Sequence, residues 1–151
     1  MLKNNRSFCL GFCLCLVLSI AFLQCPTPSS AFEIDIQVSP STLNIQSDGQ
    51  VVTVHTNIAY SSVVDADGEE ASAVTLNDIP ISWWKADNQG NFVAKFLMSE
   101  VKALAADDLL VVPGENTLTL SGMTTDETPA EFWGTETITV IDVVPSGSDG
   151  K

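Results

Sequence analysis

Apolar and polar residues alternate with a period of two through most of the chain beyond residue 31. The alternating runs lie at 33–38, 51–58, 79–84, 92–98, 117–120 and 137–140. Because successive side chains of a β-strand point to opposite faces, such runs predict strands with one buried face. The runs are rich in Val, Ile and Thr, the β-branched residues that suit a pleated surface.

Turn-forming residues separate the alternating runs. Asp and Gly cluster at 47–49, 65–68 and 87–90, and Pro113-Gly114 marks a further turn. Short strands divided by such turns predict an all-β fold, a sandwich of two sheets. The segment 99–108 has helical propensity instead, and Ser99 would cap it, so we expect one or two helical turns crossing between the sheets.

The N-terminal segment has the pattern of a secretory signal peptide. Lys3 and Arg6 precede an apolar run at 8–23, which is shorter than the ~20 residues that span a bilayer. Small residues at Ser29 and Ala31 predict cleavage after Ala31. An uncleaved membrane anchor is the alternative. We expect the mature protein to be secreted, periplasmic or at the cell surface, with no membrane span.

The cysteines all belong to this same segment. They are Cys9, Cys13, Cys15 and Cys25. Cleavage after Ala31 removes them, so the mature domain has no disulfide and no thiolate metal ligand. Lipidation of Cys25 is an alternative, but Gln24 stands where a lipoprotein signal requires a small residue.

The length of the chain sets its domain organisation, and its net charge limits the classes of molecule it can bind. The 151 residues accommodate the signal peptide (1–31), one domain (32–144) and a flexible tail (145–151) without an aliphatic or aromatic side chain. Nineteen Asp and Glu oppose 6 Lys and Arg, for a net charge of −13. This balance argues against binding to the phosphates of nucleic acids and to anionic lipid surfaces. It also favours a soluble monomer when the protein is free.

Both ends of the domain carry a recognisable pattern. Residues 34–54 contain a strand, a proline, an Asn-containing turn, Ser-x-Gly and a second strand, and residues 118–138 contain a Gly- and Asp-rich final hairpin. The pattern resembles small Ig-like modules of bacterial extracellular and cell-surface proteins. The resemblance implies an Ig-like antiparallel β-sandwich. Related modules often carry an Asp-rich loop suggestive of calcium, but here its place at 87–91 holds one carboxylate.

Two loops are the candidates for a calcium site. Asp65, Asp67 and Glu69 alternate in the first loop, which begins like an EF-hand loop but lacks its last carboxylate. Asp87 and Asn91 bound the second loop. Calcium takes 6–8 oxygen ligands, several of them carboxylates, so each loop alone is a weak site. The alternatives are a solvated acidic loop and a plain Asn-Gly-type hairpin turn, and no cofactor is otherwise expected.

The sequence contains few candidate catalytic residues. His55 is the only histidine and is expected to face solvent on an alternating strand. No Gly-x-Ser-x-Gly nucleophile turn occurs, while a pair of carboxylates for glycoside hydrolysis stays open. We therefore expect no enzymatic activity, and a small hydrolase is the least favoured alternative.

The tryptophans are the candidates for a binding surface. Trp83 and Trp84 are adjacent in a strand and must point to opposite faces. The alternation assigns Trp83 to the core with Ile79 and Ile81. Trp84 is then either exposed, as a surface for stacking sugars or contacting proteins, or covered by loops. Trp133 is the second candidate.

The sequence therefore predicts a secreted, non-enzymatic Ig-like module with a binding or structural role. Its partner would be a protein or a polysaccharide. The alternative is a carbohydrate-binding module that uses an exposed tryptophan and a structural calcium ion.

Overall fold

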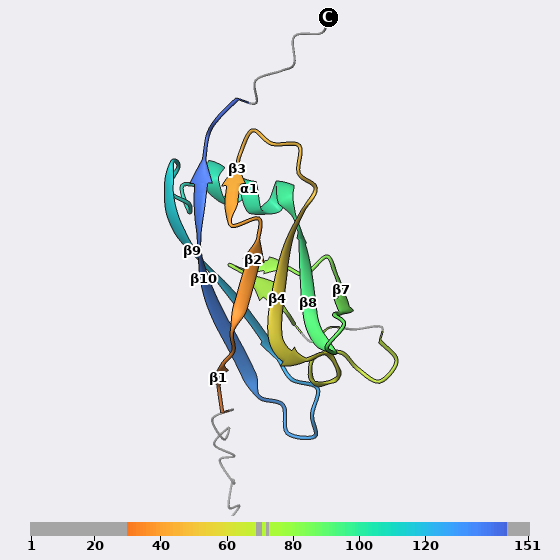
Figure 1. Ribbon diagram of the computed structural model, residues 1–151. Coiled ribbons are helices and arrows are strands. Elements are labelled where there is room, and N and C mark those ends of the chain that lie inside the picture. Colours follow the sequence, from red (N-terminus) through yellow and green to blue (C-terminus); the bar gives the residue numbers. More distant parts are fainter. Residues whose placement is uncertain (1–29, 69–70, 72, 145–151) are drawn as a thin grey trace, which may run out of the picture.

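Two β-sheets pack face to face in the computed structural model, which describes residues 30–68, 71 and 73–144 (Figure 1). Sheet A contains β1 (Phe32–Glu33), β3 (Thr42–Asn44), β5 (Thr75–Leu76), β6 (Ile79–Pro80), β9 (Gly114–Met123) and β10 (Glu131–Ile141). Sheet B contains β2 (Ile36–Ser39), β4 (Val51–Ala59), β7 (Trp83–Ala86) and β8 (Asn91–Leu97). The expected all-β, two-sheet architecture is confirmed. Most of the predicted signal peptide and the predicted tail lie outside the described residues.

The sequence predicted an antiparallel sandwich, and for sheet A this prediction is wrong. Sheet B is antiparallel in the order β2-β4-β8-β7, but β1 and β3 pair with β10 in parallel, so sheet A is mixed. The cause is that the N-terminal segment changes sheets twice. The Ile34 amide donates to Trp133 of sheet A, whereas the next carbonyl, that of Asp35, accepts from Asn57 of sheet B. The alternating run at 33–38 is therefore two strands.

Gly134 makes this change of sheet possible. A Cβ atom at this position would lie 2.6 Å from the carbonyl oxygen of Ile34 and 2.7 Å from the side chain of Ile36. Any larger residue would push the N-terminal segment away from β10.

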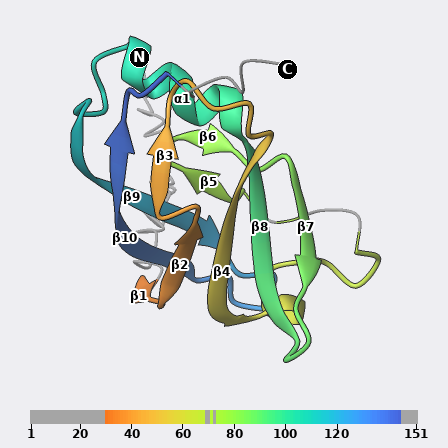
Figure 2. The same ribbon diagram turned by 45° about the horizontal axis from the view of Figure 1, so that its top comes forward.

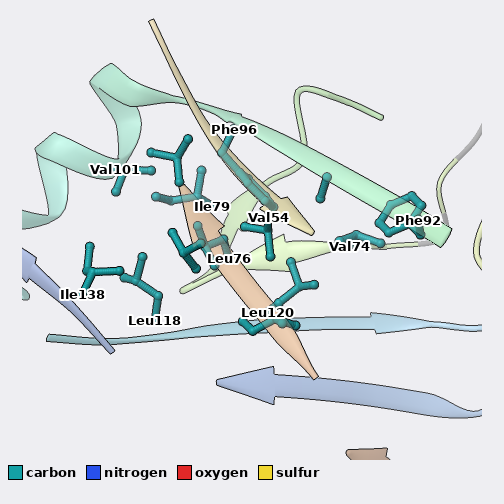
Figure 3. Close-up of a cluster of buried hydrophobic side chains, with 14 of the residues drawn as sticks. Val54, Val74, Leu76, Ile79, Phe92, Phe96, Val101, Leu118, Leu120 and Ile138 are labelled. Atoms are coloured by element: carbon teal, nitrogen blue, oxygen red, sulfur yellow. The ribbon is translucent and has the colours of Figure 1, made fainter. Parts of the chain in front are cut away.

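The core lies between the sheets and is built from the inward faces of the long strands. Leu118 and Leu120 of β9 face Val54 of β4 and Phe96 of β8 across the interface (Figure 3). Within the described residues every buried side-chain nitrogen or oxygen has a hydrogen-bond partner. The packing of apolar side chains, with no polar group left unsatisfied, is the main source of stability.

Helix α1 (Met98–Ala106) closes one end of the sandwich and connects β8 of sheet B to β9 of sheet A (Figure 2). It buries Met98, Val101 and Leu104, which recur at helical spacing. The predicted crossing helix is confirmed, but Ser99 is not its cap: the N-cap is Leu97, without a side-chain hydrogen bond. A short 3-10 helix, η1 (Tyr60–Ser62), follows β4. The described residues contain no helix both long and apolar enough to cross a membrane.

Candidate ligand-binding face of sheet B

The two adjacent tryptophans point to opposite faces of sheet B, but Trp83 is not the one that faces the core. Trp83 is 39% exposed, whereas Trp84 is half-buried and packs against the core. The register explains the difference, because Trp83 pairs with the outward-pointing Lys95 and Trp84 pairs with the buried Ala94. The assignment of Trp83 to the core is therefore wrong. Trp84 is half-buried because its side chain faces the opposite sheet, and no covering loop is needed to explain its burial.

The chain passes from one sheet to the other just before these tryptophans. The Ile81 amide donates to Val74, beside sheet A, while the Ser82 amide donates to Lys95 of sheet B. The alternation that begins at Ile79 therefore does not continue into β7. Extending one period of two across this crossover gives the wrong face.

Trp83 belongs to an outward surface formed by all four strands of sheet B. The register aligns Trp83, Lys95, Thr53 and Ser39 in one row, and Lys85, Val93, His55 and Gln37 in the next. We call these eight side chains the Trp83 face. Neighbouring strands lie about 4.8 Å apart and alternate residues about 6.8 Å apart, so the face is a regular array. His55 is exposed on it, as predicted.

Lys95 lies over the indole ring of Trp83. Its Nζ atom is 5.6 Å from the ring centroid, which is within the range of a cation–π interaction. The contact holds an ammonium group beside the exposed aromatic ring and restricts the orientation of both side chains.

Val93 shows that the side chains of this face pack against one another. It is fully buried although it lies between Phe92 and Ala94 of the core and therefore points outward. Its register partners are Lys85 and His55. Lysine covers apolar neighbours with its methylene stem and keeps its ammonium group in water. The side chains of the Trp83 face thus pack against one another, and the lysine ammonium groups lie on its solvent side.

A groove of about 410 Å³ continues the face toward the β7–β8 turn. Its polar side chains are mainly carboxamides and carboxylates: Asp35, Gln37, His55, Asn57, Asp87, Gln89 and Asn91. Two of these, Gln37 and His55, also belong to the Trp83 face. Carboxamides donate and accept hydrogen bonds in one plane, so the groove can bind a ligand rich in hydroxyl groups.

Asp87 organises the turn beside the groove. Its Oδ1 atom accepts hydrogen bonds of 2.8 Å from the backbone amides of Gln89 and Asn91. These bonds hold the pKa of Asp87 below its ordinary value of 3.8, and the bond from the Asn91 amide has the largest effect. Gly90 follows with a φ of +83°, which glycine adopts without strain. The loop is a hairpin turn between β7 and β8, as the turn residues predicted.

The calcium candidates do not meet in one group. Asp65 and Asp67 lie in the loop after η1, Asp87 and Asn91 lie in the β7–β8 turn, and Glu69 is outside the described residues. Among residues that are described, His, Cys, Asp and Glu form no group of three able to hold a metal ion. Calcium binding stays a prediction that the geometry does not support.

Trp133 lies on the outer face of the other sheet and is 38% exposed. Its register partners are Ser121 of β9 and Glu33 of β1. We call the outward side chains of β9 and β10 the Trp133 face; five of these eleven residues are threonines, and Glu115 and Glu131 are the first of them in the two strands. Lysine and histidine are missing from this face in the described part of the chain.

No family model, no curated protein and no solved structure matches this chain. The candidate site therefore depends on its geometry alone.

Sequence reasoning missed the residues that surround Trp83. The outward direction of Lys95 follows from the alternation in β8, but its position against Trp83 follows from the pairing of β7 with β8. The sequence feature that could have predicted this pairing is the hairpin turn at 87–90, because the type of a hairpin turn fixes the register of the two strands it connects.

Proposed function

We propose that this protein is a secreted, non-enzymatic Ig-like module that binds polysaccharide through the Trp83 face. The observation that carries the proposal is an exposed tryptophan on the outward face of sheet B, which leads into a groove lined by carboxamides. This is the carbohydrate-binding alternative of the sequence, which named Trp84 and Trp133, with the binding surface now assigned to Trp83 instead.

The chemistry of the face supports a sugar ligand. The apolar C–H side of a pyranose ring packs on an indole ring, and the sugar hydroxyl groups require donors and acceptors around it. Thr53 and Ser39 supply hydroxyl groups in the row of Trp83, and Gln37 supplies a carboxamide toward the groove. An array of this kind suits an extended chain of sugars.

The remaining parts of the proposal have separate support. The signal-peptide pattern at 1–31 supports secretion. The two packed sheets, with an N-terminal segment that contributes to both, support the Ig-like assignment together with the resemblance at 34–54 and 118–138.

Isothermal titration against a panel of soluble polysaccharides tests the proposal. Trp83→Ala should weaken the binding of a responsive polysaccharide by about 30-fold, the effect of removing an interface hot spot. Trp133→Ala is the matched control and should leave binding within twofold. Absence of binding to every member of the panel, or equal losses in both variants, would contradict the proposal.

A protein-binding role is the second candidate, favoured by a different surface. Leu109 and Val111, in the connection from α1 to β9, are 67% and 63% exposed. Leu109 also lines a cleft of about 410 Å³ with Leu104. A protein partner bound here would be lost in Leu109→Ser/Val111→Ser and retained in Trp83→Ala. The reverse result would assign that partner to the Trp83 face.

A further inference from the structure

Positive charge is concentrated on the Trp83 face of a strongly acidic protein. The structure describes three basic residues of the chain, Lys85, Lys95 and Lys102. Two of them, with the single histidine His55, lie on this one face. Lys102 lies on α1 and donates to the carbonyl of Ser47.

The two lysines occupy neighbouring positions in the array. Lys85 of β7 pairs with Val93, and Lys95 of β8 pairs with Trp83, so the lysines are diagonal neighbours on adjacent strands. Such neighbours have Cβ atoms about 7–8 Å apart. Both ammonium groups can therefore contact one extended ligand that crosses the tryptophan.

The two carboxylates at the groove end accept hydrogen bonds from neutral groups, which do not cancel their charge. The Asp35 Oδ2 atom accepts a hydrogen bond of 2.8 Å from the Asn57 side chain. Asp87 accepts from the backbone of its own turn. No described carboxylate is paired with Lys85 or Lys95 across the rows of the face, because their register partners are Val93, Trp83 and Thr53. The cations of the face are consequently directed to solvent.

The position of Lys95 distinguishes an anionic sugar from a neutral one. A neutral ring that stacks on Trp83 must share the indole with an ammonium group that is 5.6 Å from its centroid. An anionic ring gains a charge-assisted hydrogen bond from that same ammonium group. The contact opposes the first ligand and favours the second.

We infer that the Trp83 face selects polysaccharides that carry carboxylate or sulfate groups over neutral ones. The inference rests on the proposed polysaccharide-binding function and specifies its substrate class. An acidic polypeptide would satisfy the lysines, but it would leave the stacking surface and the carboxamide groove without a use.

Titration with two matched pairs of polymers tests the selection, using protein produced from the full-length coding sequence. Polygalacturonate is compared with its methyl-esterified form, and dextran sulfate with dextran. We expect at least one anionic polymer to bind more than fivefold tighter than its neutral counterpart at physiological salt. The first pair identifies carboxylate as the recognised group and the second identifies sulfate.

Charge variants locate the selection on the face. Lys85→Gln and Lys95→Gln should each weaken binding of the anionic polymer by about two- to fivefold, as for exposed ion pairs. Lys102→Gln removes the same charge from α1 and should change binding by less than twofold. Circular dichroism checks that each variant is folded.

The outcomes separate the inference from the proposed function. Equal binding of each polymer and its neutral counterpart, with a loss in Trp83→Ala, would overturn the inference and retain the function. Polyglutamate binding as tightly as the anionic polymers, with the same dependence on the lysines, would also overturn it, in favour of an acidic polypeptide. Failure of all polymers to bind would overturn both.

Discussion

The two sheets of this protein each present one tryptophan of nearly equal exposure, 39% for Trp83 and 38% for Trp133. Their surroundings differ. Trp83 lies under Lys95 in a face with a second lysine, whereas Trp133 lies between Ser121 and Glu33. Exposure of an aromatic ring therefore does not by itself define a binding surface. The charge beside the ring decides which ligands can use it.

The composition of the Trp133 face has an explanation within the fold. Thr135 pairs with Thr119 and Thr137 with Thr117 across β10 and β9. Cross-strand pairs of β-branched residues stabilise a sheet, and threonine keeps its outer side polar. The Thr75 and Ser121 hydroxyl groups lie 3.0 Å apart and bond to each other. These hydroxyl groups support the sheet and need no ligand.

The largest expected difference between the two sheets is in stability, and it concerns one glycine in each: Gly134 of β10 in sheet A and Gly90 of the β7–β8 turn in sheet B. Gly134→Ala should lower the free energy of unfolding by about 3 kcal/mol, because its Cβ atom would overlap the Ile34 carbonyl. Gly90→Ala meets no atom within 4 Å and should cost only the positive φ, about 1–2 kcal/mol. Urea denaturation measures both. An equal or smaller loss in Gly134→Ala would show that the N-terminal segment does not pack against β10 as described.

Asn77 tests the Trp133 side of the molecule without touching the Trp83 face. It has a φ of +46° in the two-residue β5–β6 turn, and its Oδ1 atom accepts a 2.7 Å hydrogen bond from the Thr119 amide. Asn77→Ala should destabilise the protein by about 1–2 kcal/mol, measured by denaturation. Asn77→Gly keeps the backbone conformation and loses only the acceptor, so it should cost less. Binding to the Trp83 face should be unchanged in both variants.

Transfer of a cation to the other sheet asks directly whether charge makes the difference. Ser121 pairs with Trp133 as Lys95 pairs with Trp83. In a Trp83→Ala background, Ser121→Lys should raise affinity for the anionic polymer about two- to fivefold, measured by titration. Ser121→Gln is the uncharged control. An unchanged affinity would mean that the carboxamide-lined groove beside sheet B matters more than the cation.

The smallest expected effect is local and concerns the turn of the Trp83 face. The lowered pKa of Asp87 means that its carboxylate stabilises the β7–β8 turn above the ordinary value of 3.8. That contribution is lost as the pH falls through the still lower pKa of the folded state. Amide hydrogen exchange at Gln89 and Asn91 should therefore accelerate, relative to neighbouring amides, below about pH 3.8. Asp87→Asn should remove this pH dependence, and persistence of it would assign the effect to another carboxylate.

Local patterns of the sequence were sufficient for most elements. The period of two located the strands, and the helical segment at 99–108 corresponds to α1. These predictions succeed because alternation and propensity act between near neighbours of the chain. They failed at 33–38 and at 79–84, two places where the chain leaves one sheet and enters the other within a single alternating run. The alternation there refers to two different partners.

The sequence by itself determined an acidic, two-sheet β fold with a turn at 87–90 and an apolar N-terminal segment typical of secretion. Only the tertiary structure decided which tryptophan is exposed and what surrounds it. Trp83, Lys95 and His55 come from three strands, and their meeting depends on the register between those strands. Register is a cooperative property of distant segments, since a slip of one residue moves every side chain to the other face.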